Sequence, residues 1–118
     1  MAPARITCCH ILIKTQNSRR PQSWRDPQGL RILNTTQDQA IAQMSTIREN
    51  ILNGQADFRD VASQISDCGS AQRGGDLGEF GRGDMQLAFE EAAFALNVGE
   101  ISPVIVTDSG VHIIYRMA

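Results

Sequence analysis

The chain has 118 residues, of which 42% are hydrophobic and 20% are charged, and its formal net charge is −2. These values are ordinary for a globular protein, and the length suits one compact domain over residues 1–118. The apolar runs are too short to cross a bilayer and the N-terminus lacks the apolar core of a secretory signal, so we expect no membrane association and a location in the cytoplasm and nucleus.

The three cysteines give no usable disulfide framework. Cys8 and Cys9 are adjacent and Cys68 stands alone, an odd count that suits a reducing compartment. The tripeptide ending in His10 does not predict a metal site either, because neighbouring residues of a strand point to opposite faces. We therefore expect neither a bound metal nor a cofactor.

Charge is unevenly distributed along the chain. Residues 14–31 contain five basic side chains against the single acid Asp26, so this stretch carries +4 and the remainder carries −6. A basic segment on an acidic body indicates a specific anion site rather than a general nucleic-acid surface. The five basic residues are Lys14, Arg19, Arg20, Arg25 and Arg31.

The first predicted element is a strand over residues 5–14. Its alternation places Ile6, Cys8, His10, Leu12 and Lys14 on one face, and Cys9, Ile11 and Ile13 on the other. Residues 15–33 contain two prolines and a glycine and predict a long loop, a length typical of functional or disordered segments. The only tryptophan, Trp24, lies within it and is expected to anchor the loop on the body of the domain.

Helices and a hairpin follow the loop. Residues 36–53 predict a helix that begins with the capping-box pair Thr36 and Gln39 and ends before Gly54. Next come a helix over 57–66, a loop over 68–75, a short strand over 76–80, a turn at 81–83, a helix over 86–96, and a hairpin of strands 104–107 and 111–116 joined at 108–110. This order predicts an α+β domain with an antiparallel sheet flanked by helices.

Several stretches, in one order along nearly the whole chain, resemble the parvulin family of peptidyl-prolyl cis/trans isomerases, and in particular its phosphate-directed, Pin1-type branch. The resemblance implies a parvulin-like four-stranded antiparallel sheet flanked by about four helices, in a monomeric, stand-alone form without a WW domain, as found in plants and some protists. The matching stretches are residues 10–14, 18–21 with Trp24, 62–68, 74–80, 81–86, 89–90 and 107–114.

The resemblance also implies a reaction and its site residues. Rotating an X–Pro bond means crossing an amide-resonance barrier of about 18–20 kcal/mol, and no bond need be broken. The implied proline pocket consists of Leu77, Met85 and Phe89. Without the surrounding motif, these apolar side chains would be assigned to ordinary core packing. The implied catalytic residues are His10, Cys68, Gln86, Thr107, Ser109 and His112.

Two roles stay open among these residues. His10 and His112 are the only histidines, and we expect a hydrogen-bonded pair, supported by Thr107, with a structural and electrostatic role rather than one in proton transfer. Cys68 is either a nucleophile or, as we favour, a group that tunes local charge and disfavours the planar amide.

The resemblance assigns Lys14, Arg19 and Arg20 to phosphate binding, which makes phosphorylated Ser/Thr-Pro proteins the expected partners. Guanidinium groups grip phosphate bidentately, although a basic loop without the rest of the motif would be read as a solvated surface. The alternatives are a phosphoSer/Thr-Pro binding module with incidental isomerase activity, and a nucleic-acid binder. The net negative charge and single tryptophan count against nucleic acid.

Overall fold

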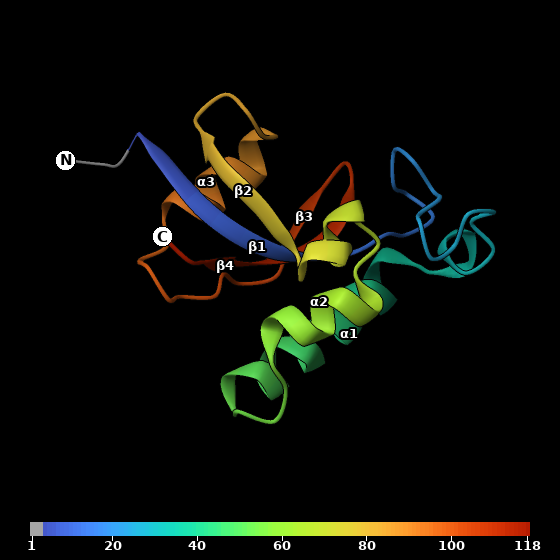
Figure 1. Ribbon diagram of the computed structural model, residues 1–118. Helices are drawn as coiled ribbons and strands as arrows, with labels where there is room; N and C mark the ends of the chain where they lie inside the picture. The colour runs from blue at the N-terminus through green and yellow to red at the C-terminus, as the bar shows by residue number, and fades with distance from the viewer. Residues whose placement is uncertain (1–3) are drawn as a thin grey trace.

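The computed structural model describes residues 4–118, so residues 1–3 of the predicted domain lie outside the described part (Figure 1). Within residues 4–118, four strands form one antiparallel sheet in the order β2-β1-β4-β3. The strands are β1 (Arg5–Ile13), β2 (Asp76–Gly81), β3 (Ile105–Thr107) and β4 (Gly110–Arg116). The predicted α+β class and the four-stranded antiparallel sheet are confirmed.

Three α-helices, rather than the expected four or so, accompany this sheet within residues 4–118: α1 (Gln37–Leu52), α2 (Phe58–Ile65) and α3 (Leu87–Phe94). Two short 3-10 helices, η1 (Ile32–Asn34) and η2 (Gly69–Arg73), make up the other helical turns. The segment after Cys68 was predicted as a loop and instead forms η2, which ends at Gly74 in the left-handed conformation. Glycines at both its ends keep this segment from growing into an α-helix.

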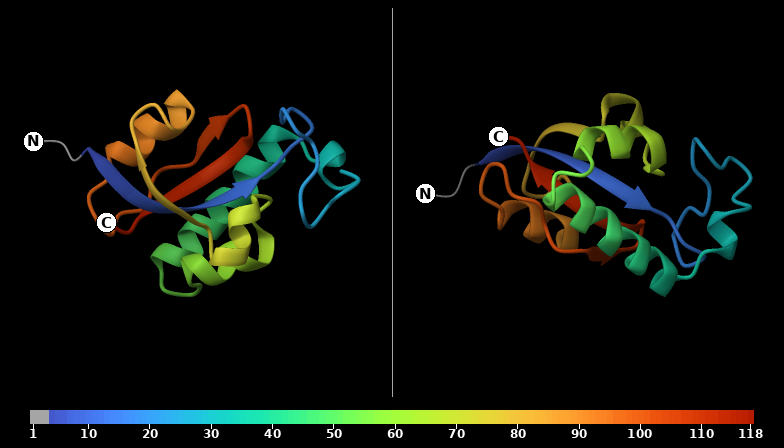
Figure 2. Two further views of the ribbon diagram at one scale, coloured as in Figure 1. Left: turned by 45° about the horizontal axis from the view of Figure 1, so that its top comes forward. Right: turned by 90° about the horizontal axis from the view of Figure 1, so that it is seen from below.

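The sheet is covered on both faces. Figures 1 and 2 show α1 and α2 on one face and α3 on the other. Cys9, Ile11 and Ile13 of β1 pack in the core under α1 and α2, whereas Ile6 and Cys8 pack in the core under α3. The predicted alternation of β1 is therefore confirmed, and it places His10 on the α3 face beside Phe89.

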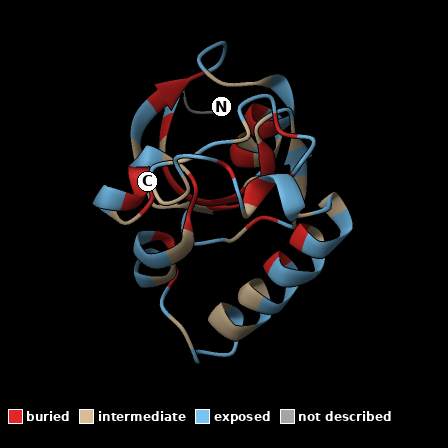
Figure 3. Ribbon diagram, turned by 90° about the vertical axis from the view of Figure 1, so that its right-hand side faces the viewer, coloured by how far each residue is buried: buried red, intermediate tan, exposed pale blue. Residues whose placement is uncertain are grey.

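The long helix α1 begins where the sequence predicts. Thr36 accepts a hydrogen bond from the Gln39 backbone N–H at 3.1 Å, and the Gln39 side chain accepts one from the Thr36 N–H at 2.9 Å. This reciprocal capping box satisfies two donors that a helix terminus otherwise leaves unpaired. Only one side of α1 meets the sheet, and Figure 3 shows its remaining surface exposed to solvent.

The loop after β1 is ordered and fastened to the domain. Its end forms η1, and Ser23 and Asp26 pair as an isolated bridge within it. The Trp24 indole Nε1–H donates to the Ser66 carbonyl at 2.8 Å, which confirms the predicted anchor. The loop therefore has a defined conformation and lies beside the end of β1.

Candidate active site

A cavity of about 210 Å³ lies on the α3 face of the sheet. It brings together every residue that the sequence assigned to catalysis or to the proline pocket, contributed by β1, β2, α3, the β3–β4 hairpin and the segments that precede η2 and α3. Its lining residues are His10, Cys68, Leu77, Met85, Gln86, Phe89, Thr107, Ser109 and His112.

Two histidines form the floor of this cavity. In the β1–β4 register His10 lies opposite Ile114 and His112 lies opposite Leu12, so the two imidazoles are diagonal neighbours on one face. Their Nδ1 atoms are 3.1 Å apart and their rings stack with centroids 5.3 Å apart. Phe89 packs its ring edge-to-face against both, at 5.5 Å from His10 and 5.4 Å from His112.

Burial keeps both imidazoles neutral. It lowers the pKa of His10 to about 4, and it lowers that of His112 to about 3 with a further contribution from the neighbouring His10. In a neutral pair one Nδ1 donates and the other accepts, which agrees with the short distance between them. The Nε2 atom of His10 is buried and makes no hydrogen bond within residues 4–118.

A chain of hydrogen bonds runs from His112 to the start of α3. The Nε2 atom of His112 is 2.7 Å from the Thr107 hydroxyl oxygen, which also accepts the Ser109 backbone N–H at 3.1 Å. The Gln86 amide then donates to the Ser109 hydroxyl at 3.0 Å, and its oxygen accepts the Asp108 N–H at 3.3 Å. This chain ties the β3–β4 turn to the residue that precedes α3 and so fixes one wall of the cavity.

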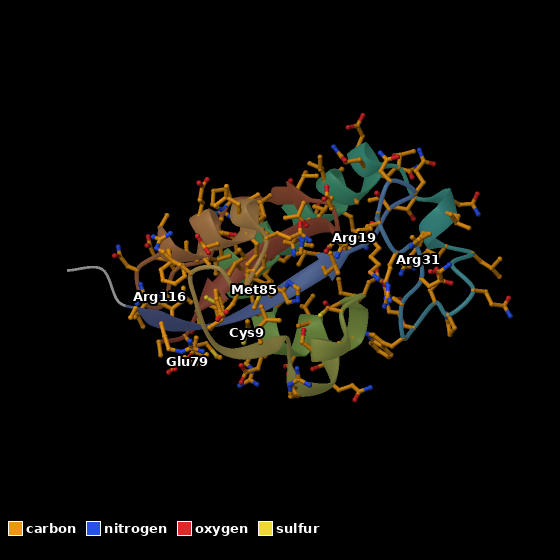
Figure 4. The ribbon with its side chains drawn as sticks, turned by 90° about the horizontal axis from the view of Figure 1, so that it is seen from above. Cys9, Arg19, Arg31, Glu79, Met85 and Arg116 are labelled. Carbon is orange, nitrogen blue, oxygen red and sulfur yellow. The ribbon has the colours of Figure 1, made fainter. Side chains whose placement is uncertain are left out.

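A second cavity, of about 250 Å³, adjoins the first. Lys14, Arg19 and Arg20 line it, and it shares Cys68 and Ser109 with the first cavity. Figure 4 shows Met85 over the sheet and Arg19 where the basic loop begins. The three cations predicted to bind phosphate thus lie together, next to the predicted proline pocket.

The electrostatics of the second cavity favour an anion. Partial burial lowers the pKa of Lys14. Asp67 and Cys68 oppose this shift, and Arg20 adds a smaller lowering of its own. The Lys14 ammonium donates to the Gln22 carbonyl at 2.6 Å, which directs it along the loop. A bound anion would relieve the mutual repulsion between Lys14 and Arg20.

Asp67 organises this region, although no motif in the sequence assigned it a role. Asp67 is 2% exposed, and its carboxylate accepts hydrogen bonds from the Lys14 backbone N–H, Ser23, Arg25 and Arg31. The signal was present, because an acid directly precedes Cys68 in a chain whose basic loop carries an excess of four positive charges. Nothing in the sequence shows that this acid meets the loop, since more than thirty residues separate Arg31 from Asp67.

The other two cysteines lie away from both cavities. Cys8 and Cys9 are fully buried in different cores, on opposite faces of the sheet, and burial raises the pKa of each thiol to about 11. Across residues 4–118, no three His, Cys, Asp or Glu side chains come together as metal ligands. In the same range, no helix has the length and apolar character needed to span a bilayer.

Residues 10–118 match the rotamase family of PPIC-type PPIase domains. The chain is 58% identical over 113 residues to the peptidyl-prolyl cis-trans isomerase Pin1 of Arabidopsis thaliana, and the match covers 96% of this chain and 95% of the plant protein. It is 43% identical over 117 residues to the peptidyl-prolyl cis-trans isomerase ESS1 of Saccharomyces cerevisiae, covering 98% of this chain and 66% of the yeast protein.

The fold agrees with a solved structure of the same kind. The peptidyl-prolyl isomerase ESS1 from Candida albicans superposes with a TM-score of 0.93 at 45% identity, covering 98% of this chain and 63% of that one. Family match, sequence identity and fold agree, so this chain belongs to the parvulin, or PPIC-type, family of peptidyl-prolyl cis/trans isomerases, within its Pin1-type branch.

Proposed function

We propose that this isomerase acts on X–Pro bonds in which X is phosphoserine or phosphothreonine. The observation that carries the proposal is that the two cavities adjoin, with Cys68 and Ser109 belonging to both. Successive Cα atoms of a peptide lie about 3.8 Å apart, so the proline ring and the side chain before it must occupy neighbouring sites. A proline in the first cavity directs the preceding side chain toward the second.

The chemistry of the second cavity suits a phosphate group. A phosphorylated side chain carries a charge of about −1.5 to −2 and three strong acceptor oxygens. Arg19 and Arg20 supply forked donors and Lys14 a compact positive charge, and all three line one cavity. Three cations around one dianion also explain why so basic a segment belongs to a chain of net charge −2.

The first cavity supports a non-covalent mechanism. Leu77, Met85 and Phe89 supply the apolar surface that holds the pyrrolidine ring. Catalysis then requires that contacts to the twisted amide be stronger than contacts to the planar one. Neutral imidazoles suit this role, because rotation transfers no proton, and they keep the cavity floor rigid.

Two side chains at the rim are placed for the amide itself. We assign Gln86 as the donor to the substrate carbonyl, because it lines the first cavity and its amide has two N–H donors, of which Ser109 accepts one. Cys68 lines both cavities and so lies at their boundary. We assign it an electrostatic role there, beside the X–Pro amide that rotates without any bond being broken. The same position would also allow a thiolate to attack the carbonyl, which is the competing mechanism.

The test compares cis/trans exchange rates, measured by NMR, on matched peptides that contain pSer-Pro, Glu-Pro or Ser-Pro. The Arg19→Ala/Arg20→Ala variant is measured alongside. As a control, Arg59→Ala/Arg73→Ala removes the same charge from two exposed arginines that line neither cavity. We expect fast exchange of pSer-Pro that collapses in the first variant and persists in the second.

Other outcomes would change the assignment. Equal rates on all three peptides would leave an isomerase without phosphate selectivity. Binding of pSer-Pro with no acceleration of exchange would favour the alternative, a phosphoSer/Thr-Pro binding module with incidental isomerase activity. We also propose that the protein acts as a monomer on phosphorylated proteins, because both cavities are built from one chain.

A further inference from the structure

Asp67 lies at the junction of the basic loop, the first strand and Cys68. Its carboxylate accepts the Lys14 N–H at 2.9 Å and the Ser23 hydroxyl at 2.8 Å. It also accepts Arg25 Nε at 3.2 Å and pairs with Arg31. Four donors from residues 14–31 therefore converge on one carboxylate whose side chain is fully buried.

The backbone around Asp67 is equally fixed. Its N–H donates to the Leu12 carbonyl at 2.7 Å, and the Leu12 N–H donates to the Ser66 hydroxyl at 3.0 Å. The Trp24 indole is held by the Ser66 carbonyl one residue earlier. Residues 66 and 67 thus run beside the end of β1, with the loop docked on them and Cys68 next in the chain.

These contacts divide the basic residues into two groups. Arg25 and Arg31 are engaged by Asp67, whereas Lys14, Arg19 and Arg20 line the second cavity. Asp67 lines the same cavity, so its charge would repel a phosphate there unless the two arginines compensated it. Neutralisation of the Asp67 charge by Arg25 and Arg31 therefore matters for phosphate binding as much as attraction by the three cations that line the cavity.

We propose that Asp67 is a positioning residue for phosphate selectivity. By pairing with Arg25 and Arg31 it docks the basic loop beside Cys68. Lys14, Arg19 and Arg20 then remain available as hydrogen-bond donors to the phosphate. This inference rests on the proposed phosphate-directed function. It adds a specific cause, the placement of the loop by a buried carboxylate that acts through Arg25 and Arg31.

A competing reading makes the opposite prediction. If Arg25 and Arg31 served directly as phosphate ligands, removing the Asp67 charge would free them and strengthen phosphate binding. If Asp67 docks the loop, removing its charge loosens the loop and weakens phosphate binding. The sign of the effect of Asp67→Asn therefore separates the two.

The experiment measures kcat/KM on the pSer-Pro and Ser-Pro peptides for the full chain and for Asp67→Asn. We expect the ratio of the two values to fall about tenfold or more, mainly through a higher KM for pSer-Pro, because hydrogen bonds to a charged group are lost. Asp38→Asn is the matched control, since it removes the same charge from an exposed position on α1. A ratio that stays the same or rises in Asp67→Asn would overturn the proposal.

The single tryptophan reports loop docking independently of activity. The Trp24 indole N–H is hydrogen bonded, so its NMR signal is expected to exchange slowly with solvent in the wild-type protein and faster in Asp67→Asn. An unchanged exchange rate would contradict the docking role. If wild-type protein shows no preference for pSer-Pro, the phosphate-directed function fails, and the tryptophan signal still decides whether Asp67 docks the loop.

A second variant covers the case in which Asp67→Asn does not fold. Arg31→Gln removes one partner whose side chain is 37% exposed and leaves the buried carboxylate paired with Arg25 and Ser23. We expect the selectivity ratio to fall in this variant too. Where both variants fold, their effects should be strongly non-additive, because each breaks the same pair. Additive effects would show that Arg31 and Asp67 act separately and would overturn the proposal.

Discussion

The imidazoles of His10 and His112 meet Nδ1 to Nδ1 at 3.1 Å although 102 positions separate them in the chain. The first and last strands of the domain are neighbours in the sheet, and their register places both rings on the face covered by α3. Burial keeps both neutral, and Phe89 and Thr107 hold them in place. The floor of the candidate active site is therefore also a contact between the first and last strands of the domain.

This pair predicts a loss of stability in mild acid. Unfolded histidines bind protons as the pH falls through about 6.5. The folded histidines do not until the pH reaches about 4 for His10 and about 3 for His112. The unfolded state therefore gains protons first, and the free energy of unfolding should fall by on the order of 3 kcal/mol between pH 7 and pH 5. Urea unfolding at the two pH values measures this change.

The chain contains no other histidine, so the same experiment on His10→Gln provides the control. About half of the pH dependence should disappear in that variant, because one of the two buried groups is gone. Equal unfolding free energies at pH 7 and pH 5 in the wild-type protein would mean that the two rings are not held neutral.

Phe89→Ala should damage both stability and activity. Phe89 is 4% exposed and touches both histidine rings, so its removal opens a cavity and unpins the floor of the site. We expect a loss of about 3–5 kcal/mol in unfolding free energy. The fall in kcat/KM should be similar for phosphorylated and unphosphorylated peptides, since the residue faces the proline.

Phe94→Ala is the matched control on the same helix. Phe94 is half-buried and packs on Phe80 and Arg82, outside both cavities. It should lower stability with little change in kcat/KM. Comparable activity losses in the two variants would show that α3 contributes to activity only through the overall stability of the domain.

Gly75→Ala should destabilise the domain more than Gly78→Ala. Both glycines have positive φ, of 83° and 73°, so both substitutions carry the same backbone cost of about 1–2 kcal/mol. Only at Gly75 would the new methyl group collide with backbone, at 2.5 Å from the His10 carbonyl oxygen, whereas it has open space at Gly78. We expect Gly75→Ala to lower the thermal midpoint clearly further, and equal midpoints would contradict the close approach of Gly75 to the β1 backbone at His10.

Alkylation should select Cys68 in the native protein. Cys8 and Cys9 are 0% exposed and burial raises the pKa of both thiols, whereas Cys68 is half-buried and lines both cavities. Mass spectrometry after treatment with N-ethylmaleimide should show one adduct in the native state and three in denaturant. Because that adduct would fill the site, isomerase activity should disappear with it.

The Cys68→Ser variant supplies the control for this measurement. It should take up no adduct in the native state and two in denaturant. Modification of Cys8 or Cys9 in the native variant would show that the sheet opens locally at β1, and the selectivity would then not reflect burial alone.

The sequence determined the local elements closely, because their signals are local. The capping pair Thr36 and Gln39 begins α1 where predicted, and the alternation of β1 correctly separates Cys8 from Cys9. The differences are short helical turns. The segments containing η1 and η2 read as loops because proline, glycine and polar residues hide a single 3-10 turn from any periodicity.

Motifs spread along the chain identified the candidate site residues, but they did not predict the distances between these residues in the fold. The sequence by itself named His10, His112 and the three cations predicted to bind phosphate, since each stands in a recognisable motif. Only the sheet order and the β1–β4 register decided that the histidines meet, because pairing between the ends of a chain leaves no local trace.

The role of Asp67 was decided by tertiary structure alone. A carboxylate in a polar stretch carries no sign of its partners, and its meaning comes from the loop folding back over residues 66 and 67. Charge can be counted from the sequence, but which charges cancel depends on separations of a few ångströms in space. The sequence thus determined which chemistry this protein holds, and the packing of the loop on the sheet decided which of its cations remain available to a substrate.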